Sequence, residues 1–180
     1  NKPAVASSVE SGSEFFASKA VDGNASTRWA SKYGLATEAD PHWIYVDLGD
    51  TLNVRTIRLS WEYRKATNYK IQTATELTGA ESDWTDQAVF NTYPSARVET
   101  IDLGEAKQAR YVRVYVTGAT SEDFDGGTAW PTISIYEMEV YGGQPPITLA
   151  EIMDDIQVAL PEDVVTPEEV TDTLPICTLC

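Results

Sequence analysis

The segment Lys19-Ala-Val-Asp-Gly-Asn-Ala-Ser-Thr-Arg-Trp29 gathers oxygen-bearing side chains on a tight turn, immediately before a large apolar residue. The oxygen-bearing residues around Gly23 are Asp22, Asn24, Ser26 and Thr27. Hard oxygen ligands of this kind suit Ca²⁺ far better than a soft transition metal. The segment therefore predicts a calcium site, and the alternative is an ordinary Asp-Gly turn that leads into a core tryptophan.

The spacing of these oxygens is not that of an EF-hand loop. Counting from Asp22, the sixth position is Thr27, where that loop needs glycine, and the twelfth is a tyrosine, where it needs a bidentate glutamate. A carboxylate from elsewhere in the chain must then complete the site. The segment Ile135-Tyr-Glu-Met-Glu-Val-Tyr-Gly142 offers Glu137 or Glu139 for this purpose.

The composition limits the classes of partner. A chain of 180 residues allows one domain of ordinary size plus an appendage. Its formal net charge of −15 argues against nucleic acid, because phosphate binding needs a basic face, and against an anionic membrane surface for the same reason. The apolar runs are far shorter than a membrane span. We expect a mature or excised piece of a longer protein.

The charge is distributed unevenly, which predicts a domain boundary. All 13 Lys and Arg residues lie in residues 1–142, whereas residues 143–180 hold eight acidic residues and no basic one. The junction is rich in Gly and Pro, as linkers are. Residues 148–160 carry a capping box and a helical apolar stripe that ends at Pro161. We interpret residues 143–180 as an acidic linker with one short helix, or the start of a following module; docking of this helix on the first domain is the alternative.

Two cysteines, Cys177 and Cys180, lie at the end of the chain. A single CxxC is compatible with redox chemistry or half a zinc site, but this one has neither a βαβ context nor a second ligand pair. Residues 1–142 contain no cysteine, so their fold does not depend on disulfides.

The body of the chain has the alternation of an all-β fold. Six β-rich runs are bounded by Gly, Asp, Asn or Pro. They are 43–48, 54–61, 69–75, 97–103, 109–117 and 133–141. Alternation places Arg55 with Ile57, Leu59 and Trp61 on one face, and Val112 with its valine neighbours opposite Tyr111, Arg113 and Tyr115. Many short strands without a βαβ rhythm predict a sandwich or jelly roll.

Seven short segments in register resemble the coagulation-factor C-type (discoidin) domains, and among them the family 32 carbohydrate-binding modules. They are Ala20–Asn24, Thr27–Trp29, Trp43–Gly49, Leu59–Glu62, Tyr69–Gln72, Ala109–Arg113 and Tyr136–Gly142. The pattern is closest to members that bind chitosan or β-glucans. This resemblance covers residues 1–142 and implies a discoidin-like, eight-stranded β-sandwich (jelly roll).

The resemblance also implies a function and a set of calcium ligands. The domain would be a non-catalytic, monomeric module, secreted or on the cell surface of a bacterium, that targets an attached secreted glycan-active enzyme to polysaccharide or glycan termini. Its structural Ca²⁺ would be held by backbone carbonyls and side chains that join the first loop to the last strand. Matched segment by segment, the ligands are Lys19, Asp22, Asn24, Thr27, Tyr136 and Glu137.

Sugar recognition at a surface needs an aromatic platform and convergent polar groups. We interpret Trp29, Trp43, Trp61 and Trp84 as core, because they fall in or next to predicted strands. Trp130, on a Gly-rich loop, and Tyr33, on a long loop, are the candidate platforms. The resemblance supplies Glu10, Glu62 and Arg64 as polar partners, although Tyr63-Arg64-Lys65 replaces the small residues common after Trp-Glu in similar modules. Chitosan, β-glucan and glycans ending in galactosyl or GlcNAc units are the expected ligands.

Two other functions remain open at this point. An enzyme is disfavoured, because the only histidine is His42 and no Ser-His-Asp set, HExxH or phosphate loop is present. A discoidin-type adhesion domain that binds a cell-surface protein or lipid is the alternative to the carbohydrate-binding module. Relatives that bind membranes present apolar loop tips with basic residues, which this acidic chain does not show.

Overall fold

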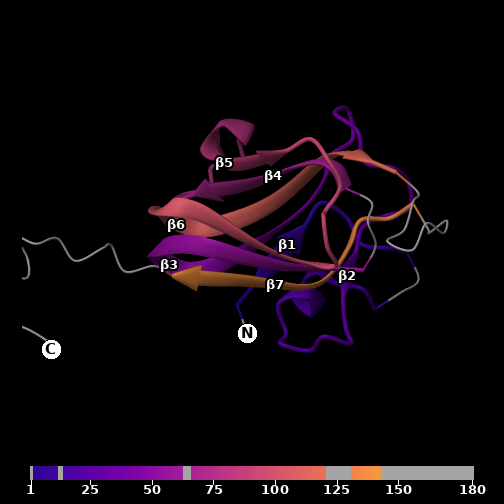
Figure 1. Ribbon diagram of the computed structural model, residues 1–180, viewed down its shortest axis with the longest axis horizontal. Helices are drawn as coiled ribbons and strands as arrows, with labels where there is room; N and C mark the ends of the chain where they lie inside the picture. Colours follow the sequence, from indigo (N-terminus) through magenta and orange to yellow (C-terminus); the bar gives the residue numbers. More distant parts are fainter. Residues whose placement is uncertain (1, 12–13, 63–65, 121–130, 143–180) are drawn as a thin grey trace, which may run out of the picture. The chain divides into compact units, whose positions relative to one another are not determined.

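The computed structural model describes residues 2–11, 14–62, 66–120 and 131–142, and its ordered elements are almost entirely strands (Figure 1). The strands are β1 (Ala4–Ala6), β2 (Trp29–Ala30), β3 (His42–Trp61), β4 (Ala66–Ala74), β5 (Thr85–Phe90), β6 (Val98–Ala119) and β7 (Ser134–Gly142). Two single turns of 3-10 helix, η1 (Ala17–Ala20) and η2 (Glu81–Asp83), complete the described elements. None of the helices in these ranges has the length and apolarity needed to cross a membrane.

The strands form an antiparallel sheet that folds over itself. Its order is β2-β7-β3-β6-β4-β5, and β1 pairs with β3. The first half of β3 pairs with the second half of β6, whereas Thr56–Ser60 pairs with Val98–Asp102 and, on the other side, with β7. Each long strand therefore contributes to both layers, with β4 in the upper and β7 in the lower layer of Figure 1. Counting the two halves of β3 and β6 separately, and omitting the two-residue β2, gives the predicted eight strands.

Both long strands turn the corner between the layers in the same way. Each has the local sequence Asp-Leu-Gly, and in each the aspartate Oδ1 accepts the backbone N–H of the glycine two residues later, at 2.8 Å. Gly49 and Gly104 have φ angles of 86° and 77°, a region that favours glycine. The corners thus depend on an Asx-turn followed by a residue without a side chain.

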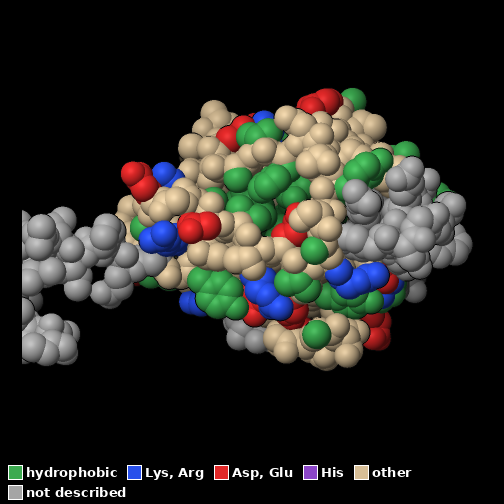
Figure 2. Space-filling model, in the orientation of Figure 1, with side chains coloured by type: hydrophobic (Ala, Val, Ile, Leu, Met, Phe, Trp, Pro, Cys, Tyr) green, Lys and Arg blue, Asp and Glu red, His purple; other side chains and the backbone are tan. Residues whose placement is uncertain are grey.

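The core lies between the two layers and is built around aromatic rings. The Trp61 ring lies 5.4 Å from that of Tyr69, and Tyr69 stacks on Phe90 at 4.5 Å. Glu99 Oε2 accepts hydrogen bonds from the Trp61 indole (2.9 Å) and the Tyr69 hydroxyl (2.8 Å), so both polar groups are satisfied. In Figure 2, hydrophobic side chains gather in the middle of the visible face, between β4 and β6.

A β-bulge at the start of the second half of β3 changes which residues face the core, so the predicted alternation is wrong there. The register shifts between Val54 and Thr56, and the extra residue places Val54, only 1% exposed, in the core. Arg55 does not share the core face of Ile57, as strict alternation predicted; its side chain pairs with Asp102 at the surface. A two-residue period cannot reveal such an insertion.

The core interpretation of the tryptophans is correct for two of the four. Trp29 and Trp61 are at most 1% exposed. It is wrong for Trp43 and Trp84, which are half-buried. Trp43 points away from the core because its strand neighbours Ile44 and His42 point inward.

The described residues belong to one compact unit. The predicted boundary at residue 142, the predicted helix over 148–160 and the pair Cys177 and Cys180 concern residues outside the described ranges, so they stay predictions.

Replacing Trp61 by alanine should lower the free energy of unfolding by about 3–5 kcal/mol, because a buried indole leaves a cavity and two partners of Glu99 become one. Urea unfolding followed by fluorescence or circular dichroism measures the change. Val89→Ala, at a side chain 54% exposed, should change it by about 0.5 kcal/mol or less. A loss at Trp61 no larger than that of the control would contradict the assignment of this ring to the core.

Candidate functional site

Four loops that are far apart in the sequence meet at one end of the sandwich. This end is where β2 lies in Figure 1, opposite the end at which β7 finishes at Gly142. Backbone hydrogen bonds of 2.8–3.1 Å join the loops. The N–H donors and their carbonyl acceptors are Glu10 to Ala30, Ser31 to Ile133, Gly34 to Pro131 and Glu62 to Ser134. Three of the predicted sugar-binding residues, Glu10, Tyr33 and Glu62, belong to these loops.

These three side chains differ in how far they are exposed to solvent. Tyr33 is 66% exposed, so its ring is open to a ligand, as a stacking platform requires. Glu10 is half-buried and Glu62 is only 7% exposed. Arg64 and Trp130 lie outside the described residues, and their predicted roles stay predictions.

Arg28, a residue not assigned to the site from sequence, connects these loops. Its Nε lies 2.7 Å from Glu62 Oε2 and donates a hydrogen bond to Ser134 Oγ at 3.1 Å. The guanidinium carbon lies 3.6 Å from the centroid of the Phe15 ring, a cation–π contact. Glu62 Oε2 accepts no hydrogen bond of good geometry within the described ranges, so the contact with Arg28 is an ion pair. The segment Thr27-Arg-Trp29 was the signal that could have identified Arg28.

The predicted calcium loop places oxygen atoms around Thr27. Thr27 Oγ1 lies 2.8 and 2.9 Å from the two oxygens of Asp22, 3.0 Å from the Asn24 carbonyl oxygen and 3.5 Å from that of Lys19. A hydroxyl has one proton and satisfies only one of these acceptors at a time. The remaining oxygens are therefore held close together without a proton between them, which is what a cation site of hard ligands requires.

Glu137 reaches this loop from β7. Its Oε1 accepts the Asn24 backbone N–H at 2.9 Å, across 113 positions of sequence. Burial is the main cause that raises the pKa of Glu137, and the charges of Asp22 and Glu139 act in the same direction, against the hydrogen bonds from the Asn24 and Gly23 N–H groups. A buried carboxylate beside another carboxylate is the kind of group that a bound cation stabilises.

A second bulge lies next to Glu137. Ser60 of β3 is opposite Glu137 and Trp61 is opposite Ile135, so Tyr136 has no partner in β3. A bulged residue is left out of the ladder of backbone pairs, which is compatible with a ligand role for the Tyr136 carbonyl.

The predicted ligands are all oxygen atoms, the donors that Ca²⁺ takes. Within the described ranges, no group of three or more His, Cys, Asp or Glu residues is placed to hold a metal ion. The predicted site has only two carboxylates, Asp22 and Glu137, and completes its set with carbonyl and hydroxyl oxygens. Such sets are typical of Ca²⁺, which binds carboxylate, carbonyl and hydroxyl oxygens.

His42 has the surroundings of a structural residue. Its side chain is fully buried, neither ring nitrogen has a hydrogen-bond partner within the described ranges, and burial lowers its pKa. A ring that is neutral and enclosed does not exchange protons with a substrate at the surface.

Comparisons with known proteins find a matching family and similar solved structures. Residues 19–114 match the family described as the NedA-like, galactose-binding domain. Chitosan-binding module 1 from a chitosanase/glucanase of Paenibacillus sp. IK-5 is 39% identical, with a TM-score of 0.65 over 79% of this chain and 96% of that module. Chitosan-binding module 2 of the same enzyme, solved in complex with chitotriose, is 38% identical with a TM-score of 0.65, over 79% of this chain and 97% of that one.

A more distant structure shares the fold. The family 32 carbohydrate-binding module of C. perfringens NanJ, solved with galactose, is 24% identical with a TM-score of 0.57, over 77% of this chain and 91% of that module. No curated protein matches the chain. The predicted family and the predicted discoidin-like sandwich are thereby confirmed.

Replacing Arg28 by methionine should destabilise the domain by about 1–3 kcal/mol, because Glu62 then keeps a charge in a largely buried place without its partner. The double variant Arg28→Met/Glu62→Gln should recover part of this loss, which a double-mutant cycle in urea quantifies. Additive effects of the two substitutions would show that the ion pair does not couple the loops.

Proposed function

The chain belongs to the family of NedA-like, galactose-binding domains of the coagulation-factor C type, and we propose that it is a non-catalytic carbohydrate-binding module. Its role would be to hold an attached, secreted glycan-active enzyme on a polysaccharide. The observation that supports this most is the meeting of four loops at one end of the sandwich, where the exposed Tyr33 ring lies among loops that carry Glu10 and Glu62. An exposed ring on a surface whose loops also carry hydrogen-bond acceptors is typical of a sugar site.

The polar groups favour a sugar that donates hydrogen bonds. Carboxylates such as Glu10 accept from hydroxyl groups, and a protonated amine offsets their desolvation by a charge-assisted bond. An amino sugar of a chitosan-like or β-linked chain is therefore the ligand class we propose. The chitosan-binding modules that are 38–39% identical to this chain support that choice.

We expect the loop site to be shallow and open to solvent, so its affinity should be modest. We expect a Kd between about 1 μM and 1 mM for a short oligosaccharide. Useful retention on a polymer would then come from avidity with neighbouring modules.

Replacing Tyr33 by alanine should weaken oligosaccharide binding by about 1–2 kcal/mol, the range for one aromatic contact, with little change in stability. A glycan array selects the ligand, and isothermal titration of chitosan and β-glucan oligosaccharides measures the loss. Leu35→Ala, in the same loop and 43% exposed, is the matched control and should bind like the unmodified chain.

Unchanged binding in Tyr33→Ala would remove this ring from the site and leave Trp130 as the platform to test. If the unmodified chain binds no chitosan, β-glucan or galactosyl glycan at millimolar concentration, the adhesion function takes precedence.

We also propose a structural Ca²⁺ in the loop that precedes β2. The Lys19 and Asn24 carbonyls, the Asp22 and Thr27 side chains, the Tyr136 carbonyl and Glu137 would hold it. The ion would supply a cross-link between the N-terminal loop and β7, and no chemistry of catalysis. The crowded oxygens around Thr27 Oγ1 and the buried Glu137 support this proposal.

Removal of calcium should lower the melting temperature of the domain, because an ion that binds only the folded state adds on the order of 3 kcal/mol at a hundredfold excess over Kd. Asp22→Ala should abolish the difference between melting in Ca²⁺ and in EDTA. Glu76→Ala, at an exposed residue, should keep it. Equal melting of the unmodified chain in both conditions, after exhaustive removal of metal, would contradict the site.

A further inference from the structure

A cavity lies on the outer face of the sheet, away from the core. Its volume is about 240 Å³. β3 contributes Trp43 and Tyr45, β6 contributes Arg113, and the segment before β5 closes the other side. The residues of that segment are Leu77, Gly79, Ala80, Glu81, Asp83 and Trp84.

Aromatic rings form the walls of this outer-face cavity. The rings of Trp43 and Tyr45 are nearly parallel, at 15° and 5.8 Å between centroids. Trp84 lies 5.6 Å from Tyr45, tilted by 47°. All three side chains are half-buried, so they line the cavity and are reached from solvent. Rings that only covered the sheet would fill this space.

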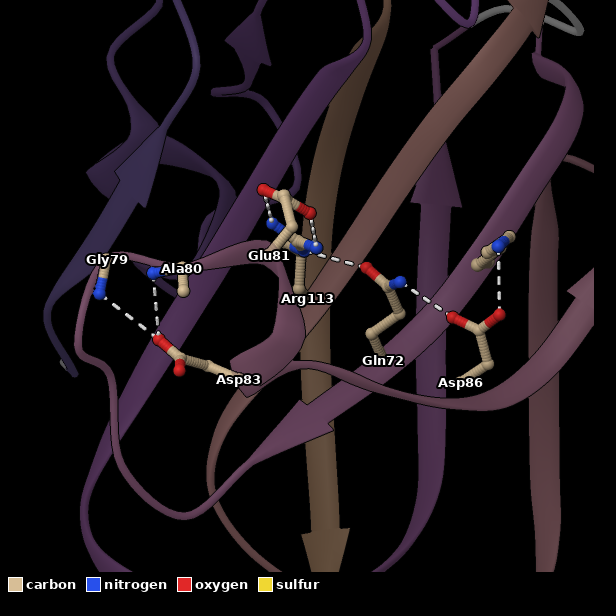
Figure 3. Close-up of polar contacts among 8 residues, drawn as sticks. Gln72, Gly79, Ala80, Glu81, Asp83, Asp86 and Arg113 are labelled. Atoms are coloured by element: carbon tan, nitrogen blue, oxygen red, sulfur yellow. Dashed lines mark hydrogen bonds and ion pairs between the residues drawn. The ribbon is translucent and has the colours of Figure 1, made fainter.

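A buried arginine forms the floor. Arg113 is 2% exposed, and its Nε donates to Gln72 Oε1 at 2.7 Å (Figure 3). Its two terminal nitrogens donate to the two oxygens of Glu81, at 3.1 and 2.7 Å, in a bidentate pair. The guanidinium carbon also lies 4.2 Å from the centroid of the Trp84 ring. The positive charge is therefore already neutralised, and Glu81 is fixed in orientation.

Glu81 is the polar group that a ligand reaches. Its side chain is 69% exposed, and each carboxylate oxygen has a lone pair beyond the one that Arg113 uses. The hydrogen bonds from Arg113 are the main cause that lowers the pKa of Glu81, so the carboxylate stays charged in mildly acidic solution. An exposed, oriented carboxylate accepts hydroxyl or ammonium donors.

The segment that closes the cavity has a fixed shape. Asp83 accepts the backbone N–H groups of Gly79 and Ala80, at 3.1 and 3.2 Å (Figure 3), and that of Thr78, at 2.7 Å. These bonds hold the loop before a ligand arrives, which reduces the entropy cost of binding.

We propose that this outer-face cavity is a second sugar site, which holds one neutral or amino pyranose unit of an oligosaccharide. The volume is below the roughly 300–1,000 Å³ of drug-sized pockets and suits a single ring. The C–H face of a pyranose carries slight positive charge and packs on the negative face of an aromatic ring. Glu81 accepts the hydroxyl or amino donors, and it repels a uronic acid because Arg113 is already paired.

This site shares no residue with the loop site at the end of the sandwich. Binding at both would let one domain hold two strands or two segments of a polysaccharide, with an avidity gain. Because the two sites are separate, each is testable without the other.

The test is a ¹H–¹⁵N NMR titration of the full chain with chito-oligosaccharide, cello-oligosaccharide and an oligouronate. We expect two sets of shifted signals for the first two ligands. One set includes the amides of Glu10 and Tyr33, and the other includes those of Tyr45 and Glu81 with the Trp84 indole. The oligouronate should not shift the second set.

Two variants isolate the outer-face cavity. Trp84→Ala should raise the Kd obtained from the second set of signals about tenfold. The Kd obtained from the first set should stay unchanged. Ala80→Trp fills the cavity without removing a ring. Ala80 is exposed and has an extended backbone (φ −91°). Its N–H donates to the Asp83 side chain and its carbonyl accepts the Asp83 backbone N–H, and neither bond involves the Ala80 side chain. Val89→Ala, outside the cavity lining, is the control. Tyr33→Ala should affect only the first set.

The outcomes separate the two sites. Shifts confined to the first set, or a second set that Ala80→Trp leaves unchanged, overturn the second site and leave the proposed function intact. Shifts confined to the second set support the second site and overturn the proposed loop site. A dimer that Ala80→Trp dissociates, with no sugar-dependent shifts in the second set, would show that this face binds another copy of the chain and would also overturn the proposal.

Discussion

The Asp-Leu-Gly corners of β3 and β6 determine how the rest of the domain is arranged. In each, an aspartate oxygen holds the N–H of a glycine with positive φ, and the strand continues into the other layer. Because β3 and β6 pair before and after their corners, the two bends must occur together. One half of each long strand then faces the core from the upper layer, and the other half faces it from the lower layer. Trp61 and Tyr69, which lie in different layers, meet as a consequence.

The same folding-over brings both ends of β3 to one end of the molecule. The loop before His42 is joined to Pro131 and Ile133 by backbone hydrogen bonds, and Glu62, just after Trp61, is joined to Ser134. Residues from distant parts of the chain therefore form one surface without any long-range motif in the sequence. The Asn24–Glu137 bond ties the preceding loop to the same strand, β7. The loop surface and the proposed cation site therefore both contact this strand.

The sequence predicted the parts of the structure that depend on local pattern. Alternating residues located the valines of β6, and short family segments located the fold and the oxygen-rich loop around Asp22. It did not predict the position of Val54, because a bulge shifts the face without changing residue types. The sequence pattern also did not identify β5, because its alternation is weak. Nor did the pattern identify the ion pair between Arg28 and Glu62, which are 34 positions apart. Which side chains meet across the domain depends on where the two long strands turn. The alternation of residues along a strand does not encode these turns.

The misassigned tryptophans show which rule was missing. Successive side chains of a strand point to opposite faces, so the neighbours of Trp43 decide which side it faces. His42, Ile44 and Val46 alternate inward, so Trp43 and Tyr45 must lie outward. An outer face normally carries polar side chains, and here it carries rings arranged around a neutralised Arg113. Burying that guanidinium requires the paired Glu81 and Gln72, and these partners shape the cavity floor. Replacing a buried ion pair by apolar residues is often neutral or stabilising, so this pair is weak evidence for a role in stability, and the exposed side of Glu81 is compatible with the proposed ligand site.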